Sequence, residues 1–260
     1  EKMLKNDYDY DDIISSLRNV GLVEGDSVFI HSNLGFFGRL KDAKNSQDYN
    51  RFFKNAIFDV IGENGTIVTP TFSYSFCNSE RFDVEQTPGV CGIFSEFIRR
   101  DITSVRSNDP NFSISAIGKF ANFFTENCAT HSFGKFSFWE RFLTKKGKIC
   151  NFNFDSASTF FHYIEKILNV SYRFDKKFQG ELKIGDKYEQ KEFEHFVYDK
   201  DNSNHIPNFE KFHNRAIQLK KVKISDLGRG QITCITADDT INIIKNEIKI
   251  QPNFLINGQI

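Results

Sequence analysis

Two short apolar segments separated by an amphipathic one constrain the fold of this chain most. Ser27–Ser32 and Gly65–Pro70 are each rich in β-branched and apolar residues, which predicts two buried strands. Between them, apolar residues recur at helical spacing from Ser46 to Ile61, and Gly62 follows as a helix stop. A strand–helix–strand order is typical of a layered α/β domain in which neighbouring strands run parallel.

The same alternation continues along the chain. It predicts helices over 11–20, 92–100, 118–127, 156–169, 207–219 and 238–250, and strands over 113–117, 148–153 and 230–236. Residues 181–184 and 188–198, joined by Gly185 and Asp186, predict an antiparallel hairpin instead. No repeat or long linker interrupts the pattern. We therefore expect a single layered α/β/α domain over 1–260, with a mixed, mainly parallel central sheet and an antiparallel hairpin insertion.

Composition limits the classes of partner. The 34 Lys and Arg residues balance 34 Asp and Glu residues, whereas a generic nucleic-acid binder carries a basic surplus. Five widely spaced cysteines without a CxxC pair argue against a disulfide framework or a zinc site, so no metal is expected. No apolar run approaches a membrane span of roughly 18 residues. We expect a cytoplasmic protein without nucleic-acid or membrane partners, for which a homo-oligomer is plausible.

Small and polar residues follow three of the expected strands, at 31–35, 70–74 and 151–158. In α/β sheets, ligands bind beyond the carboxyl ends of strands, so these three segments are candidates for one shared site. The alternative for each segment is an ordinary loop whose polar side chains hydrogen-bond to its own backbone N–H and C=O groups.

His162 is the most informative single residue. Glu165 lies three positions later on the same expected helix, so the two side chains share a face. A histidine oriented by a carboxylate can remove a proton near neutral pH. Spacing alone favours a surface His–Glu pair, and a catalytic base is the alternative. Three other histidines lack such spacing and are expected at the surface: His195, His205 and His213.

Several of these segments resemble, in order, the sequence blocks of the aminoglycoside 3-N-acetyltransferase superfamily across about residues 20 to 260. The first block is similar to Gly25–Ser32 with Leu34, and the second to 65–76. The central and active-site blocks are similar to 90–100, Arg106-Ser107, 113–118, Phe133-Gly134, Ser137 and 159–165.

The resemblance implies acyl transfer from a coenzyme A thioester to a sugar amine. It implies that His162 is the base that takes a proton from the amine, and the spacing of Glu165 suggests that this carboxylate holds the imidazole ring. Acyl-CoA, either acetyl-CoA or 3-hydroxybutanoyl-CoA, is then the donor. Residues matching cofactor-contacting positions are His31, Ser32, Asn33, Leu34, Gly35, Thr71, Arg106, Ser107, Ser113, Ile114 and Ala116.

The chain departs from the antibiotic-modifying branch of that family at two places. Asp109-Pro110-Asn111-Phe112-Ser113 stands where that branch usually has His-Pro-x-His-Ser, and Ser32-Asn33 where it usually has two serines. The first of these runs, together with 170–180, looks like a second branch, which acylates nucleotide-linked amino sugars such as dTDP-3-amino-3,6-dideoxyhexoses for bacterial surface glycans.

Charge favours the same acceptor. A polycationic aminoglycoside needs an acidic site, whereas Arg173, Lys176 and Lys177 suit the phosphates of a nucleotide. The alternative is that these three are solvated charges at a strand edge. We therefore expect a nucleotide-linked amino-sugar N-acyltransferase. The alternatives are an aminoglycoside 3-N-acetyltransferase conferring resistance and a non-catalytic protein that kept the fold. Residues expected to bind the acceptor are Tyr74, Phe76, Asp109, Trp139, Asp155, Arg173 and Lys176.

Overall fold

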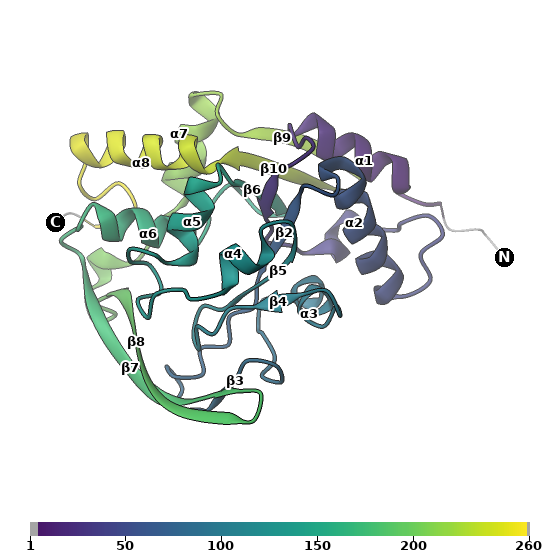
Figure 1. The fold of residues 1–260 in the computed structure, drawn as a ribbon. Helices are drawn as coiled ribbons and strands as arrows, with labels where there is room; N and C mark the ends of the chain where they lie inside the picture. The colour runs from purple at the N-terminus through teal and green to yellow at the C-terminus, as the bar shows by residue number, and fades with distance from the viewer. Residues whose placement is uncertain (1–4, 259–260) are drawn as a thin grey trace.

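The central sheet of the computed structural model has seven strands, and the structure describes residues 5–258 (Figure 1). In spatial order the strands are β4 (Val105–Arg106), β5 (Ile114–Gly118), β2 (Thr66–Pro70), β1 (Ser27–Phe29), β6 (Lys148–Phe152), β10 (Gly230–Thr236) and β9 (Lys223–Leu227). β1 pairs in parallel with β2 and β6, while the outer strands pair antiparallel. The predicted mixed α/β fold class is confirmed, and the parallel strands form the centre of the sheet.

Helices cover both faces of this sheet because its strands bury side chains on both sides. In β1, Phe29 belongs to one apolar core, and Val28 with the following Ile30 to the other. The second core receives α1 (Tyr10–Asn19), α2 (Ser46–Ile61), η1 (Leu34–Phe37) and part of α3 (Ile93–Arg99). The first receives α4 (Ala121–Thr125), α5 (Phe138–Thr144), α6 (Phe160–Ile167), α7 (Glu210–Gln218) and α8 (Ala237–Ile250).

Local signals explain the helices that the sequence predicts best. Asp9 and Asp12 form a reciprocal capping box at the start of α1. The Asn45 side chain accepts the Asp48 N–H at 3.0 Å at the start of α2, and that helix ends at Gly62 with φ of 66°. The predicted bounds of α2 are confirmed.

Other elements differ from the prediction. The helix expected over 156–169 begins only at Phe160, because the Asn151 amide holds the preceding loop through the carbonyls of Asp155 and Ala157. The expected hairpin is longer, with β7 (Arg173–Ile184) against β8 (Lys187–Tyr198). Short elements that the sequence analysis did not predict are β3 (Phe82–Asp83), β4, α5, β9, η1 and η2 (Ser203–His205).

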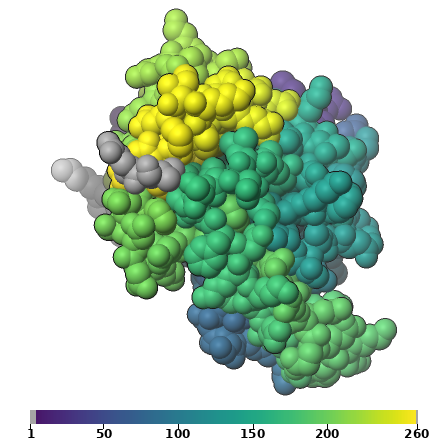
Figure 2. Space-filling model, turned by 90° about the vertical axis from the view of Figure 1, so that its left-hand side faces the viewer, coloured from purple at the N-terminus to yellow at the C-terminus, as the bar shows by residue number. Residues whose placement is uncertain are grey.

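The hairpin forms a second sheet with β3, which pairs in parallel with β7 and sets Phe82 opposite Leu182. Figure 1 shows it as a long curved arm below the helices, and Figure 2 shows its tip as a lobe beyond the helical body. Within residues 5–258, no helix combines the length and apolarity needed to cross a membrane.

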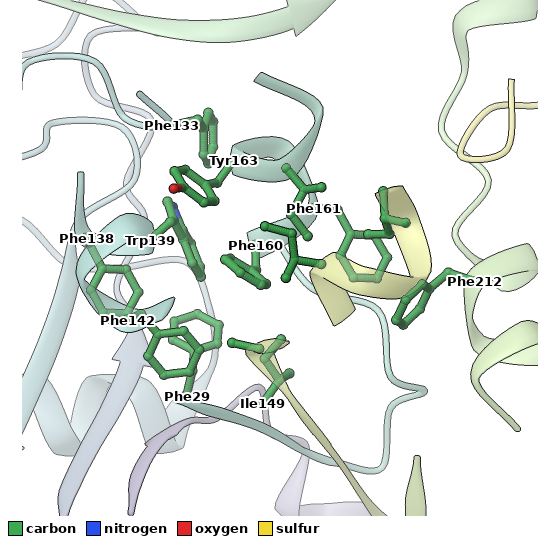
Figure 3. Packing of buried hydrophobic residues seen from close by; sticks show 14 of the residues in the cluster. Phe29, Phe133, Phe138, Trp139, Phe142, Ile149, Phe160, Phe161, Tyr163 and Phe212 are labelled. Atoms are coloured by element: carbon green, nitrogen blue, oxygen red, sulfur yellow. The ribbon is translucent and has the colours of Figure 1, made fainter. Parts of the chain in front are cut away.

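Trp139 lies in the first core, where Figure 3 shows it among aromatic rings. Its ring centroid is 5.0 Å from that of Phe29, 4.8 Å from Phe138 and 6.0 Å from Phe160, and only 1% of the residue is exposed. Almost all of the Trp139 side chain is therefore used in packing, and its contact with the acceptor stays a prediction.

Candidate active site

His162 and Glu165 form a direct pair on α6. His162 Nδ1 lies 2.8 Å from Glu165 Oε2. The Glu165 side chain is fully buried, whereas 19% of the His162 side chain is exposed. The surface His–Glu pair that spacing favoured is therefore wrong, because the carboxylate lies inside the protein and only the ring has an open edge.

Two further groups, from the chain that follows α6, contact Glu165. The Tyr172 hydroxyl donates to Oε1 at 2.9 Å, and Arg173 Nε lies 2.8 Å from Oε2. Burial alone would raise the pKa of Glu165, but the His162 hydrogen bond and the Arg173 charge lower it below its ordinary value. The carboxylate is thus ionised at neutral pH although it is buried.

His162 is a neutral imidazole at neutral pH. Burial, and next the positive charge of Arg173, lower its pKa by more than Glu165 raises it. An ionised carboxylate can only accept, so we assign the ring proton to Nδ1, which donates to Glu165. Nε2 is then left with a free lone pair and can accept a proton from a substrate.

A series of aromatic contacts leads away from His162. The ring of Phe133 lies 5.2 Å from that of His162 and 4.8 Å from that of Phe112. Phe112 in turn contacts Tyr74 at 5.4 Å and His195 at 4.9 Å. Tyr74, an expected acceptor residue, has a φ of 53° and is partly exposed. This series, which we call the aromatic wall, connects Tyr74 with the imidazole.

His195 is buried, which corrects the expectation that it lies at the surface. Its ring stacks 4.3 Å from that of Phe178, and burial lowers its pKa to about 3. The other two histidines are half-buried: His205 bonds to Asn202, and His213 Nδ1 bonds to Ser156. No sequence spacing signals these contacts, since they join separate elements.

The remaining expected acceptor residues have different surroundings. Phe76 is buried beneath the hairpin against Phe193. Asp109 is buried, accepts the Asn111 and Phe112 N–H groups and the Ser132 hydroxyl, and has a pKa that burial raises. Asp155 is exposed and accepts the Ala157 N–H. Both Phe76 and Asp109 hold loops, so any contact with an acceptor would be through those loops.

The two cations expected to bind the acceptor, Arg173 and Lys176, differ in exposure. Arg173 is buried, with 3% of its side chain exposed, and is bound to Glu165, so a phosphate contact would require it to leave that carboxylate. Lys176 is exposed, and its ammonium lies 5.3 Å from the Phe178 ring centroid. Only Lys176 of the pair is open to an incoming ligand.

The expected cofactor turn lines a cavity of about 550 Å³. Ser32, Asn33, Leu34 and Gly35 form one wall. Opposite parts come from α2 and the start of α3, namely Tyr49, Asn50, Gly92, Ile93 and Phe94. Ser32 Oγ and Asn50 Nδ2 are buried and have no hydrogen-bond partner among residues 5–258. No sequence signal marks Asn50, a polar residue inside the helix predicted from Ser46 to Ile61.

The other expected cofactor residues form an internal network. Arg106 donates to Ser113 Oγ at 3.1 Å and to the Thr71 carbonyl at 2.8 Å, and burial lowers its pKa to about 10. Ser107 Oγ accepts the Ile114 N–H at 2.9 Å. Ile114 and Ala116 are core residues of β5. His31 packs edge-on against Phe29, and burial lowers its pKa to about 4. These side chains fix the strand ends around the site.

The sequence profile described as aminoglycoside 3-N-acetyltransferase matches residues 15–249. This chain belongs to that family. No curated protein matches it. Similar solved structures include aminoglycoside acetyltransferase AAC(3)-Xa, with 18% identity, a TM-score of 0.79 and 92% of each chain covered. AAC-IIIb in a binary complex with CoASH has 17% identity, a TM-score of 0.79 and coverage of 93% and 96%. AAC-VIa bound to sisomicin has 21% identity, a TM-score of 0.79 and coverage of 94% and 98%.

The cofactor of aminoglycoside 3-N-acetyltransferases is coenzyme A, as predicted from the resemblance. The residues of the cavity fit its pantetheine arm. That arm is an extended chain with amide groups, and Ser32 Oγ and Asn50 Nδ2 are buried polar atoms that still lack partners among the described residues. The apolar side chains of Leu34 and Phe94 suit its methylene groups.

Proposed function

We propose that this chain is a single acyltransferase domain that transfers an acyl group from acetyl-coenzyme A, or another short acyl-CoA, to an amine of a sugar substrate in the cytoplasm. One observation carries the proposal. His162 has an open edge, and its Nδ1 faces a buried ionised carboxylate, so that Nε2 is free to take a proton.

The proposed mechanism uses the His162–Glu165 pair as a proton acceptor and its support. Bound coenzyme A supplies the acyl group as a thioester. His162 Nε2 takes the proton that the amine loses as its nitrogen attacks the carbonyl. Glu165 holds the ring and stabilises the positive charge that the imidazole gains, as the aspartate does in a serine–histidine–aspartate triad. As the C–S bond of the thioester breaks, the proton on His162 passes to the departing thiolate, which leaves as the thiol.

An aminoglycoside is the acceptor that the comparisons support. The family description names aminoglycosides, and AAC-VIa, which has a similar fold, is bound to sisomicin. Acetyl transfer to an aminoglycoside 3-amino group is therefore the first candidate reaction.

A nucleotide-linked amino sugar, acylated for a bacterial surface glycan, is the second candidate, and local charge supports it. The carboxylates near the aromatic wall already have partners, and Asp109 is buried and accepts the Asn111 and Phe112 N–H groups and the Ser132 hydroxyl. Glu165 contacts Arg173, and Asp175 contacts Lys166. A polycation gains little from paired carboxylates, whereas the exposed Lys176 suits an anionic ligand.

Thiol release from acetyl-CoA tests these proposals. The purified protein is assayed with kanamycin and gentamicin and, separately, with dTDP- and UDP-linked amino sugars, and the His162→Ala variant serves as the blank. Rapid thiol release with one set and none with the other assigns the acceptor class. If neither acetyl-CoA nor 3-hydroxybutanoyl-CoA releases thiol with any amine, the proposed function is wrong.

A further inference from the structure

Arg173 is the first residue of β7, where the long hairpin leaves the body of the protein. Its Nε lies 2.8 Å from Glu165 Oε2, and its Nη1 donates to the Phe196 carbonyl at 3.0 Å. The guanidinium carbon lies 5.5 Å from the Tyr198 ring centroid. The side chain starts on β7, is held by β8 and lies against the buried carboxylate, although its Nε and Nη2 make no hydrogen bond among residues 5–258.

Two cationic or potentially cationic groups face the same oxygen of Glu165. His162 Nδ1 and Arg173 Nε each lie 2.8 Å from Oε2, while the neutral Tyr172 hydroxyl occupies Oε1. A guanidinium is always charged, whereas an imidazole is charged only when protonated. Because a buried carboxylate needs one compensating charge, Arg173 makes a second positive charge on His162 unfavourable.

Other titratable groups surround this pair. His195 on β8 is buried and neutral, and His205 lies with its ring centroid 6.4 Å from that of Tyr172. Two residues after Arg173 on β7, Asp175 forms ion pairs with Lys166 and His131. Within residues 5–258, Arg173 is the one permanent positive charge recorded in contact with Glu165.

We propose that Arg173 is a positioning residue for the reaction proposed above: its fixed charge neutralises Glu165, so that His162 remains unprotonated and its Nε2 can accept the proton of the amine. The inference rests on the proposed function. It also assigns a role to the root of the hairpin, because the Phe196 carbonyl on β8 holds the guanidinium in place.

Replacing the charge tests this inference. In Arg173→Gln, we expect the NMR titration of the His162 ring to move up by about one pH unit, the effect of one nearby charge. The acid limb of kcat/KM should move to higher pH by the same amount. Activity at pH 5.5 should then fall by up to about tenfold relative to activity at pH 8.

Two matched variants separate charge from structure. Lys191→Gln removes an exposed lysine charge from β8 and should leave the pH profile unchanged. Tyr172→Phe removes the neutral donor to Oε1 and should lower kcat by a few-fold, with the acid limb moving by no more than about a third of a unit.

A folded Arg173→Gln variant with an unchanged His162 titration would overturn the inference. Should that variant fail to fold, Arg173→Lys decides. Lysine keeps the charge, so its acid limb should stay within about a third of a unit of the wild-type limb, and a full-unit shift contradicts the inference. The NMR titration needs no substrate, so it remains decisive even if the wild-type protein acylates none of the amines offered.

Discussion

The two carboxylate oxygens of Glu165 and the buried polar atoms of the cavity beside Ser32–Gly35 differ in whether protein groups contact them. Both oxygens of Glu165 contact protein groups: His162 and Tyr172 form hydrogen bonds with them, and Arg173 forms an ion pair, although Arg173 Nε and Nη2 make no hydrogen bond among the described residues. In the cavity, Ser32 Oγ and Asn50 Nδ2 have no partner among the described residues.

This difference distinguishes the region expected to carry out proton transfer, around Glu165, from the region expected to bind the cofactor, the cavity beside Ser32–Gly35. A buried donor or acceptor without a partner destabilises a protein by about 1–3 kcal/mol, and a ligand that supplies the partner removes that penalty. The His162–Glu165 pair is held ready before any substrate arrives, which is what a general base requires. Substitutions in the first region should therefore lower kcat, and those in the second should weaken cofactor binding.

The largest effect is expected from His162→Ala. Without the imidazole, no group in this arrangement takes the proton of the amine, so kcat should fall by roughly 10²–10⁴-fold with little change in KM. Steady-state kinetics measure it, and thermal unfolding confirms that the variant is folded. A near-normal kcat would show that His162 is not the base and would remove the basis of the comparison.

Glu165→Gln should have the second-largest effect. An amide cannot stabilise the imidazolium, so we expect kcat to fall by roughly 10–100-fold, less than for His162→Ala. The change also leaves Arg173 buried without a counter-charge, which should lower the free energy of unfolding by about 3–5 kcal/mol. Kinetics and denaturant unfolding test the two parts separately. If Glu165→Gln abolishes activity that His162→Ala retains, the carboxylate is the base.

The sequence predicts what depends on local pattern. The bounds of α2 follow from Ser46 and Gly62, and the spacing of His162 and Glu165 places them on one face. Whether that face is exposed or buried is not a local property. It is decided by Tyr172 and Arg173, which reach Glu165 from beyond the end of the helix.

The hairpin shows the same limit. Most residues between Phe174 and Gly180 are exposed. The first half of β7 therefore lacks the alternation of apolar and polar residues that would predict a strand. Arg173 therefore looked like a surface cation suited to phosphate, and His195 like a surface histidine. Contacts between separate elements bury both side chains, since Arg173 lies against Glu165 and the His195 ring lies against Phe178 and Phe112.

The cavity is tested by removing its unpartnered polar atoms. Ser32→Ala and Asn50→Ala should each raise KM for acetyl-CoA by roughly threefold to tenfold, the value of one hydrogen bond, and leave kcat unchanged. The free energy of unfolding should not fall, because neither atom has a bond to lose in the described structure.

Ser16→Ala is the matched control for this prediction. Its hydroxyl is buried and donates to the Asp226 carbonyl at 2.8 Å, and neither residue lines the cavity. Its removal should lower the free energy of unfolding by about 1 kcal/mol and leave KM unchanged. If Ser32→Ala lowers the free energy of unfolding as much as Ser16→Ala does, the assignment of the cavity as a cofactor-binding site is contradicted.

The smallest effect is expected at Lys176. This residue tests whether the acceptor-binding residues are already paired with protein groups, as around Glu165, or are open to a ligand, as in the cavity beside Ser32–Gly35. Its ammonium is exposed and contacts the Phe178 ring, so Lys176→Gln should not change stability. With a nucleotide-linked amino sugar, KM should rise by roughly twofold to threefold at low salt, and the difference should shrink above about 0.5 M salt, where exposed charges are screened. With an aminoglycoside, KM should fall or stay the same, because a positive charge repels a polycation. An equal rise in KM for both acceptors would show that Lys176 acts through packing on Phe178, and neither charge argument for the acceptor would then stand.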